Sequence, residues 1–231
     1  MLLGEMCLLV AAVLVMTGLA KKITARLYIN DFIATFSIFL IVLLNVRGGI
    51  GLGRGYALYL GGALSVLLSF YAFIRRTEKP SDALFGIIGC LTEAGIAFLY
   101  TYVFSSVWDA GILAFLLSIL SGVWCALVSK RTFASCLFAA NVGGFIGITL
   151  YLIFVKKGGE IGGTYTFAVM WMSAIFGLLI QHLLALTMRA VNSPRAQTFF
   201  EAGEMRENEE KSDENKEDQF KSSAEERRKR S

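Results

Sequence analysis

Seven long apolar stretches, separated by short polar connections, make up most of residues 1–190. They cover residues 2–20, 29–46, 56–74, 83–104, 110–128, 132–155 and 164–187. A helix needs ~20 largely apolar residues to cross the hydrocarbon core of a bilayer, and each stretch is close to that length. None alternates apolar and polar residues with the period of a barrel strand. The pattern predicts an all-α fold, a polytopic transmembrane helix bundle with seven spans.

Composition agrees with this prediction. Of the 231 residues, 55% are hydrophobic and 17% are charged, whereas soluble domains average about 45–50% apolar and about 25% charged residues. The charges are also unevenly placed, since residues 193–231 hold nine of the 22 Lys and Arg and eleven of the 18 Asp and Glu. The apolar body is therefore too poor in charge to cover a soluble globule, and in lipid it needs no such cover.

The basic residues between the stretches predict an orientation, because Lys and Arg accumulate on the cytoplasmic side of a membrane. The first, third and fifth connections carry eight of them, and the second, fourth and sixth carry four. The odd-numbered connections are therefore expected inside, which puts the N-terminus outside and the C-terminus in the cytoplasm. Short termini and the absence of an N-x-[ST] site fit a bacterial cytoplasmic (inner) membrane.

Residues 191–231 differ in composition from the rest of the chain. They are rich in Glu, Lys, Asn and Ser and have few apolar residues, so they cannot bury enough surface to offset the entropy of ordering. We expect a disordered, charged cytoplasmic tail, which could dock a membrane or cytoplasmic protein through residues 193–231. Nucleic acid is not an expected partner, because the other basic residues lie between apolar stretches that contact the lipid bilayer.

Glu93 is the one ionisable side chain expected deep within a span. It lies about ten residues into the fourth stretch, ~15 Å along a helix, which is the middle of a ~30 Å core. Small residues share its helical face, namely Gly86, Gly89, Cys90 and Ala97. Such a face packs against another helix. A carboxylate there is costly to ionise, so Glu93 is expected to be either a proton or cation site or a protonated donor that joins two helices.

Asn141 lies at a similar depth in the sixth stretch, which makes a hydrogen bond between Asn141 and Glu93 possible. Gly143 and Gly147 follow it as a GxxxG pair, so this segment is expected to be a packing face or a softened helix whose carbonyls bind an ion. His182, the single histidine, lies in the last stretch nearer the cytoplasm. It is either a modulating member of an ion or substrate site or an ordinary interfacial residue.

The remaining polar features carry weaker expectations. Glu5, Asp31 and Asp109 lie at the ends of stretches, where water is within reach, and are expected to be interfacial. The glycine-dense segment 47–55 is expected to be a flexible loop. The four cysteines lie in apolar stretches without CxxC spacing, which predicts packing residues rather than a metal site or a disulfide framework. No cofactor is expected.

Three classes of function remain open on the sequence. No HExxH or GxSxG motif is present, and only Glu93 is deep, so no catalytic residues are proposed and an intramembrane enzyme is the least favoured class. The favoured hypothesis is a small transporter or ion-coupled carrier that uses Glu93, with Asn141 as a partner and His182 as a modulator. The alternative is a non-catalytic membrane scaffold or regulatory subunit that acts through its helix faces and tail.

Overall fold

The computed structural model describes residues 3–17, 31–77, 79–129 and 132–191. The chain divides into two compact units, residues 1–182 and 183–231. Of the second unit, the structure describes only the end of the last helix. The predicted first connection, and the predicted tail from residue 192 onward, lie outside the described residues.

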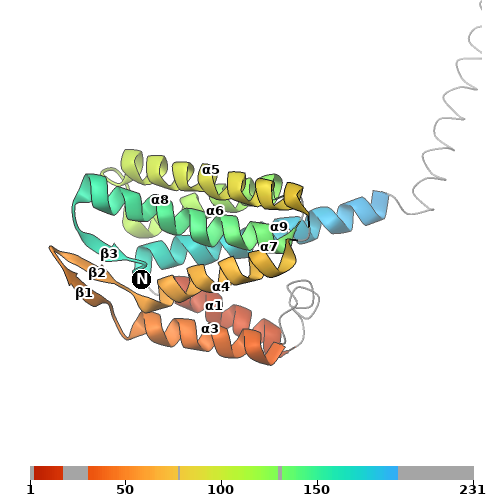
Figure 1. The fold of residues 1–231 in the computed structure, drawn as a ribbon, viewed down its shortest axis with the longest axis horizontal. Coiled ribbons are helices and arrows are strands. Elements are labelled where there is room, and N and C mark those ends of the chain that lie inside the picture. The colour runs from red at the N-terminus through yellow and green to blue at the C-terminus, as the bar shows by residue number, and fades with distance from the viewer. Residues whose placement is uncertain (1–2, 18–30, 78, 130–131, 192–231) are drawn as a thin grey trace, which may run out of the picture. The chain divides into compact units, whose positions relative to one another are not determined.

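The described chain is a bundle of helices (Figure 1). They are α1 (Leu3–Met16), α3 (Asp31–Val46), α4 (Leu60–Arg76), α5 (Pro80–Phe104), α6 (Ala110–Val128), α9 (Thr164–Val191) and a continuous helix made of α7 (Phe133–Phe138), η1 (Ala139–Gly143), α8 (Gly144–Tyr151) and η2 (Leu152–Lys156). The segments η1 and η2 are single π-helical turns. Each predicted apolar stretch contains one helix, so the predicted helical bundle is confirmed.

In the described residues, four helices are long and apolar enough to cross a membrane: Pro80–Phe104, Ala110–Val128, Phe133–Lys156 and Thr164–Thr187. Two more, Gly4–Met16 and Phe32–Val46, are apolar but shorter. The helix of the third stretch, α4, has 17 residues, because residues 56–58 of that stretch form a strand instead.

The helices pack with their small residues inward. Along its length, α5 packs against α6 on one side and against α7, η1 and α8 on another. On the other side of the unit, α4 packs against α3 and α7, and α3 packs against α1. The helix α5 begins with Pro80 in its first turn, where a missing backbone N–H costs nothing, and α6 begins after Asp109, whose carboxylate accepts a hydrogen bond from the Gly111 amide at 3.1 Å.

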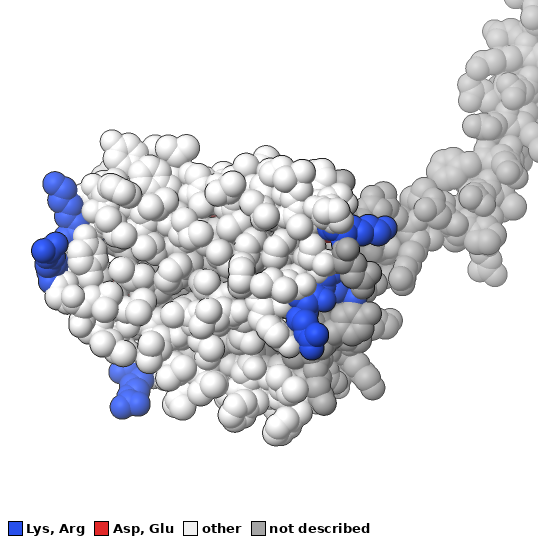
Figure 2. All heavy atoms as spheres, in the orientation of Figure 1, with Lys and Arg blue, Asp and Glu red and all other residues white. Residues whose placement is uncertain are grey.

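Polarity is distributed as expected for a protein in lipid. Large apolar side chains point outward, and Leu67, Leu91 and Leu127 are each more than 60% exposed. Polar side chains lie inside, and those with no exposed surface are Ser65, Ser69, Glu93, Ser118, Ser121, Asn141 and Ser173. Figure 2 shows that Lys and Arg lie toward the two ends of the visible face, with an uncharged surface between them. A bilayer solvates such a belt, whereas water does not.

A small sheet joins two distant connections, which corrects the expected flexible loop at 47–55. The strand β1 (Ile50–Gly53) pairs antiparallel with β2 (Tyr56–Leu58), and β2 pairs parallel with β3 (Gly159–Ile161). The hairpin turns at Arg54 and Gly55, both with positive φ, which is the backbone of the favoured two-residue hairpin. The sheet holds the second and sixth connections at one end of the helices (Figure 1), the sheet end of the unit.

Candidate functional site

Glu93 lies at the fourteenth of the 25 positions of α5, and its side chain has no exposed surface. The buried face of this helix is a stripe of mostly small residues: Gly86, Gly89, Cys90, Glu93, Ala94, Ala97 and Thr101. Because the stripe carries no bulky side chain, neighbouring helices approach α5 closely enough to enclose the carboxylate.

Two helices close around this carboxylate. On α6, the Cys125 thiol donates to Glu93 Oε2 at 3.8 Å, and the Ser121 hydroxyl, one turn earlier, has no hydrogen-bond partner among the described residues. From the sixth stretch, Gly143 lies over Glu93, since a Cβ added there would be 2.8 Å from the Glu93 Cβ. Glu93 Oε1 has no hydrogen-bond partner among the described residues.

The predicted packing glycines lie at these contacts. A Cβ added at Gly147 would meet the Ala94 carbonyl of α5 and would lie 2.8 Å from the Ala97 Cβ. One added at Gly86 would meet the Phe73 ring, whereas one at Gly89 would be in ordinary contact with Ala139. Close approach without a side chain is the reason that glycine occupies positions 86, 143 and 147.

Three of the four cysteines surround Glu93, an arrangement the spacing in the sequence does not reveal. Cys90 is on the same helix, Cys125 is on α6 and Cys136 is on α7, and each lies within electrostatic reach of the carboxylate. No group of three or more His, Cys, Asp or Glu within the described part of the chain is arranged to hold a metal ion. The thiols therefore line the Glu93 site as weakly polar, polarisable neighbours.

Asn141 does not bond to Glu93, which corrects the expected pairing. Its Nδ2 donates instead to Ser69 Oγ on α4 at 2.7 Å. Ser69 Oγ in turn donates to the Ser65 carbonyl at 2.8 Å, and Ser65 Oγ accepts a hydrogen bond from Trp171 Nε1 at 2.9 Å. Asn141 and Gly143 point in different directions from their helix. Gly143 faces Glu93, and Asn141 faces α4.

The helix is π-helical at Asn141, over Ala139–Gly143. A π-turn inserts one residue into the α-helical hydrogen-bond ladder, and such turns occur often at functional sites. In the expectation from sequence, this segment was either a packing face or a softened helix. Gly143 packs on α5 within the π-turn, so the packing face is present, whereas ion binding by the carbonyls of this segment stays a prediction.

Four polar atoms in the middle of the unit lack partners among the described residues: Glu93 Oε1, Ser121 Oγ, Asn141 Oδ1 and Ser173 Oγ. They come from four different helices, and their side chains have no exposed surface. A Cβ added at Gly122 would lie 3.1 Å from the Ser173 carbonyl oxygen, so α6 and α9 approach closely next to Ser121. Buried polar atoms are normally hydrogen-bonded, so each unpaired one is unusual.

His182 lies away from this centre, toward the end of the unit opposite the sheet. It is half-buried and follows Gln181, whose Nε2 donates to Ser129 Oγ at 2.6 Å. No hydrogen bond places His182 against Glu93 or Asn141. The structure thus brings the Asn141 segment next to Glu93 but not His182.

A second buried carboxylate, Glu5, lies on α1 and was expected at a wet interface. It is only 4% exposed, and its Oε1 accepts a hydrogen bond from Asn45 Nδ2 on α3 at 2.7 Å. The expectation was wrong because α1 and α3 pack against each other at this level. Glu5 lies in the first turn of α1, where the positive end of the helix dipole favours a carboxylate.

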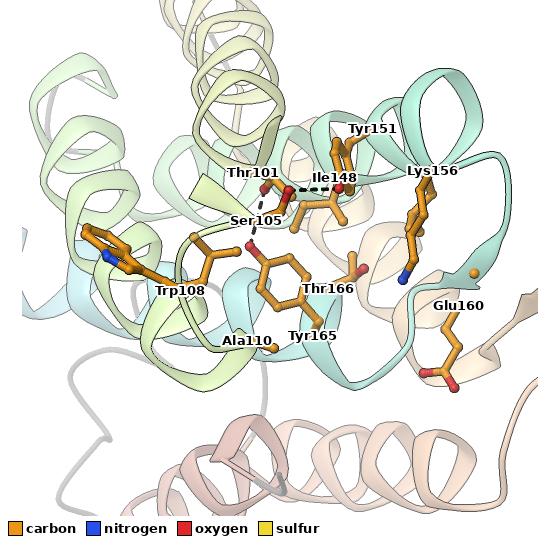
Figure 3. Close-up of a pocket in the computed structure, with 13 residues that line it drawn as sticks. Thr101, Ser105, Trp108, Ala110, Ile148, Tyr151, Lys156, Glu160, Tyr165 and Thr166 are labelled. Atoms are coloured by element: carbon orange, nitrogen blue, oxygen red, sulfur yellow. Dashed lines mark hydrogen bonds between the residues drawn. The ribbon is translucent and has the colours of Figure 1, made fainter. Parts of the chain in front are cut away.

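The sheet end carries a pocket of about 530 Å³ (Figure 3). It lies among the end of α5, the start of α6, the α8–η2 segment, β3 and the start of α9. Two hydrogen bonds tie its walls together: Thr101 Oγ1 and Tyr165 OH are 3.3 Å apart, and Tyr151 OH donates to Ser105 Oγ at 2.9 Å. Neither the pocket nor its aromatic lining was predicted.

The chain matches no family model, and neither the curated proteins nor the solved structures contain a match to it.

Proposed function

We propose that this chain is a small ion-coupled carrier of the membrane, with Glu93 as the residue that binds the coupling proton or cation. The observation that supports it is a fully buried carboxylate in the middle of α5, one oxygen of which has no hydrogen-bond partner among the described residues. Ionisable groups at membrane depth are costly, and they commonly mark ion and substrate pathways.

All seven helices are proposed to span the bilayer, with the N-terminus outside. The pairing of β2 with β3 supports this topology, because it requires the second and sixth connections to lie on the same side. Both are even-numbered connections, the set with fewer basic residues. In this proposed topology, the sheet end is the outer end of the protein. Arg75 and Arg76, in the last turn of α4, are then at the inner end, where basic residues are expected.

In this proposal, the side-chain oxygens near Glu93 have different roles in binding. Glu93 supplies the charge that holds the cation or the oxygen that takes the proton. Ser121 supplies a neutral oxygen, which is a suitable ligand for a hard cation, and Asn141 is the proposed partner on the neighbouring helix, although its amide donates to Ser69 in this structure. The π-turn allows the segment that carries Asn141 to change its hydrogen bonding when the ion leaves. His182, near the inner end, is proposed to modulate release toward the cytoplasm.

The proposal is tested with the purified full chain in liposomes that enclose a pH-sensitive dye. A panel of small organic acids and amines is added outside, and luminal pH is followed. At least one solute is expected to change luminal pH with the wild type, and Glu93→Gln is expected to abolish the change. Asp82→Asn, in the first turn of the same helix, is the matched control and should transport normally.

Circular dichroism and thermal unfolding must show that Glu93→Gln is folded. Full transport by folded Glu93→Gln would contradict the proposed role. If removal of residues 196–231 abolished function while Glu93→Gln had no effect, the alternative of a scaffold or regulatory subunit acting through its tail would replace the carrier.

A further inference from the structure

The pocket at the sheet end has the size and lining of a small-molecule site. Its volume of about 530 Å³ falls within the range of about 300–1,000 Å³ that is usual for ligand pockets. One wall is apolar and aromatic, with Trp108, Leu113, Ile148 and Tyr165. The rest of the lining includes four hydroxyl-bearing residues, Thr101, Ser105, Tyr151 and Thr166, and two charged side chains, Lys156 and Glu160 (Figure 3).

Lys156 supplies an exposed positive charge to the pocket. It lies in the last turn of η2, where the helix dipole favours a cation. Lys157, the next residue, has a φ of 53° and ends the helix, so Lys156 is its last helical residue. Within the described ranges, Lys156 takes part in no ion pair.

The other charged group of the pocket is Glu160, whose side chain is exposed and lies beside Gly163. Its Oε2 would lie 2.6 Å from a Cβ added at Gly163, so the carboxylate is folded over the residue just before α9. It also interacts with Tyr59. Burial, followed by the hydrogen bond to Glu160 and the charge of Glu160, raises the pKa of the Tyr59 hydroxyl. Lys156 is therefore the positive charge in the lining, and no acidic side chain of the described residues lies within ion-pair distance of it.

We infer that this pocket binds an anionic group carried on an apolar or aromatic body, with the anion at Lys156 and the body against Trp108 and Tyr165. Two sources offer that chemistry, a small organic carboxylate and the phosphate of an anionic lipid. An ammonium–anion pair orients the ligand, and aromatic rings bury its apolar part. The binding site stands independently of the carrier proposal, and only its use as the entry point for a transported solute rests on it.

The pocket and Glu93 lie along the same buried face of α5. Thr101, in the pocket, follows Glu93 by eight residues on the same buried stripe of α5, a distance of about 12 Å along the helix. Between them lies an apolar cluster that includes Ala97 and Leu117, and its members Ile148 and Leu152 also line the pocket. A solute bound there would be separated from the carboxylate by one closed apolar layer.

The test uses the purified full chain in phosphatidylcholine nanodiscs and two probes, phenylacetate and dihexanoyl phosphatidylglycerol. Binding is titrated by ligand-observed NMR or calorimetry. Saturable binding is expected, and Lys156→Gln should weaken it by about tenfold, as expected for loss of a charge-assisted hydrogen bond. Lys157→Gln, which removes the adjacent charge outside the pocket lining, should leave it within about twofold.

The remaining arms separate the possibilities. Glu160→Gln should leave affinity unchanged or raise it, and a loss would overturn the anion assignment in favour of a zwitterion. Glu93→Gln should bind normally, so that this inference can fail or succeed apart from the carrier proposal. Binding of phenylacetate supports a solute, and binding of the phosphatidylglycerol alone supports a lipid headgroup. No saturable binding of either probe, or binding indifferent to Lys156 in a folded variant, would overturn the site.

Discussion

Gly147 lies so close to α5 that a methyl group in place of its hydrogen would meet the Ala94 carbonyl oxygen. The substitution Gly147→Ala must therefore push the two helices apart. We expect it to lower the free energy of unfolding by about 1–3 kcal/mol, the usual cost of overpacking. Thermal unfolding in nanodiscs measures the effect.

Gly144→Ala is the matched control, since its added Cβ would have its nearest neighbour, Met170 Cγ, at an ordinary 3.7 Å. It should change stability little, and the helix propensity of alanine favours it. Equal effects of the two substitutions would contradict the close contact of Gly147 with α5.

The buried pair of Glu5 and Asn45 gives a second prediction at this scale. Asn45→Leu removes the donor to Glu5 Oε1 and leaves a buried carboxyl group without its partner. We expect a loss of about 1–3 kcal/mol. Adding Glu5→Leu should recover most of it, because replacing both partners with apolar groups is often nearly neutral. Additive losses in the double variant, measured by thermal unfolding, would contradict the pairing.

Some of these residue positions could be foreseen and others could not. The burial of Glu93 follows from its place in a long apolar stretch and from the small residues on its face. The burial of Glu5 could not be foreseen, because its partner Asn45 is 40 residues away. The convergence of cysteines on Glu93 likewise depends on which helices become neighbours, which apolar periodicity does not encode.

Among the elements, the helices were predictable and the strands were not. Apolar length determines a membrane helix almost by itself, and every predicted stretch contains one. The strands have three or four residues, and β1 consists of alternating glycines and aliphatics in Ile50–Gly53. Their pairing with β3 joins segments about a hundred residues apart, which no local pattern can show. The same limit hid the pocket, whose walls come from five elements.

Cross-linking tests the pairing of β2 with β3. Ala57 lies opposite Glu160 in the parallel register, so the double variant Ala57→Cys/Glu160→Cys should form a disulfide under mild oxidation. Gly51→Cys with Glu160→Cys is the control, because β1 and β3 flank β2 and lie about 9–10 Å apart. Cross-linking in the control pair alone, detected by mobility on reducing and non-reducing gels, would overturn the strand order.

For the whole molecule, the apolar belt and the charged ends predict how the unit sits in a membrane. With the sheet end outside, a cysteine at Arg54, in the hairpin turn, should react with a membrane-impermeant maleimide in intact cells. A cysteine at Thr77, after the end of α4, should react only after permeabilisation. The opposite pattern would invert the proposed topology and move the pocket to the cytoplasmic side.

Glu93 is proposed to exchange a proton or cation as part of the protein's activity. The most direct test follows the carboxyl infrared band of the purified protein in lipid as a function of pH, with Glu93→Gln as the blank. We expect a Glu93 band that disappears reversibly as the pH is raised and whose midpoint moves when a transported solute or coupling ion is added. A band that persists over the whole range in which the protein stays folded, and that ignores every solute, would make Glu93 a structural hydrogen-bonding group and contradict the carrier.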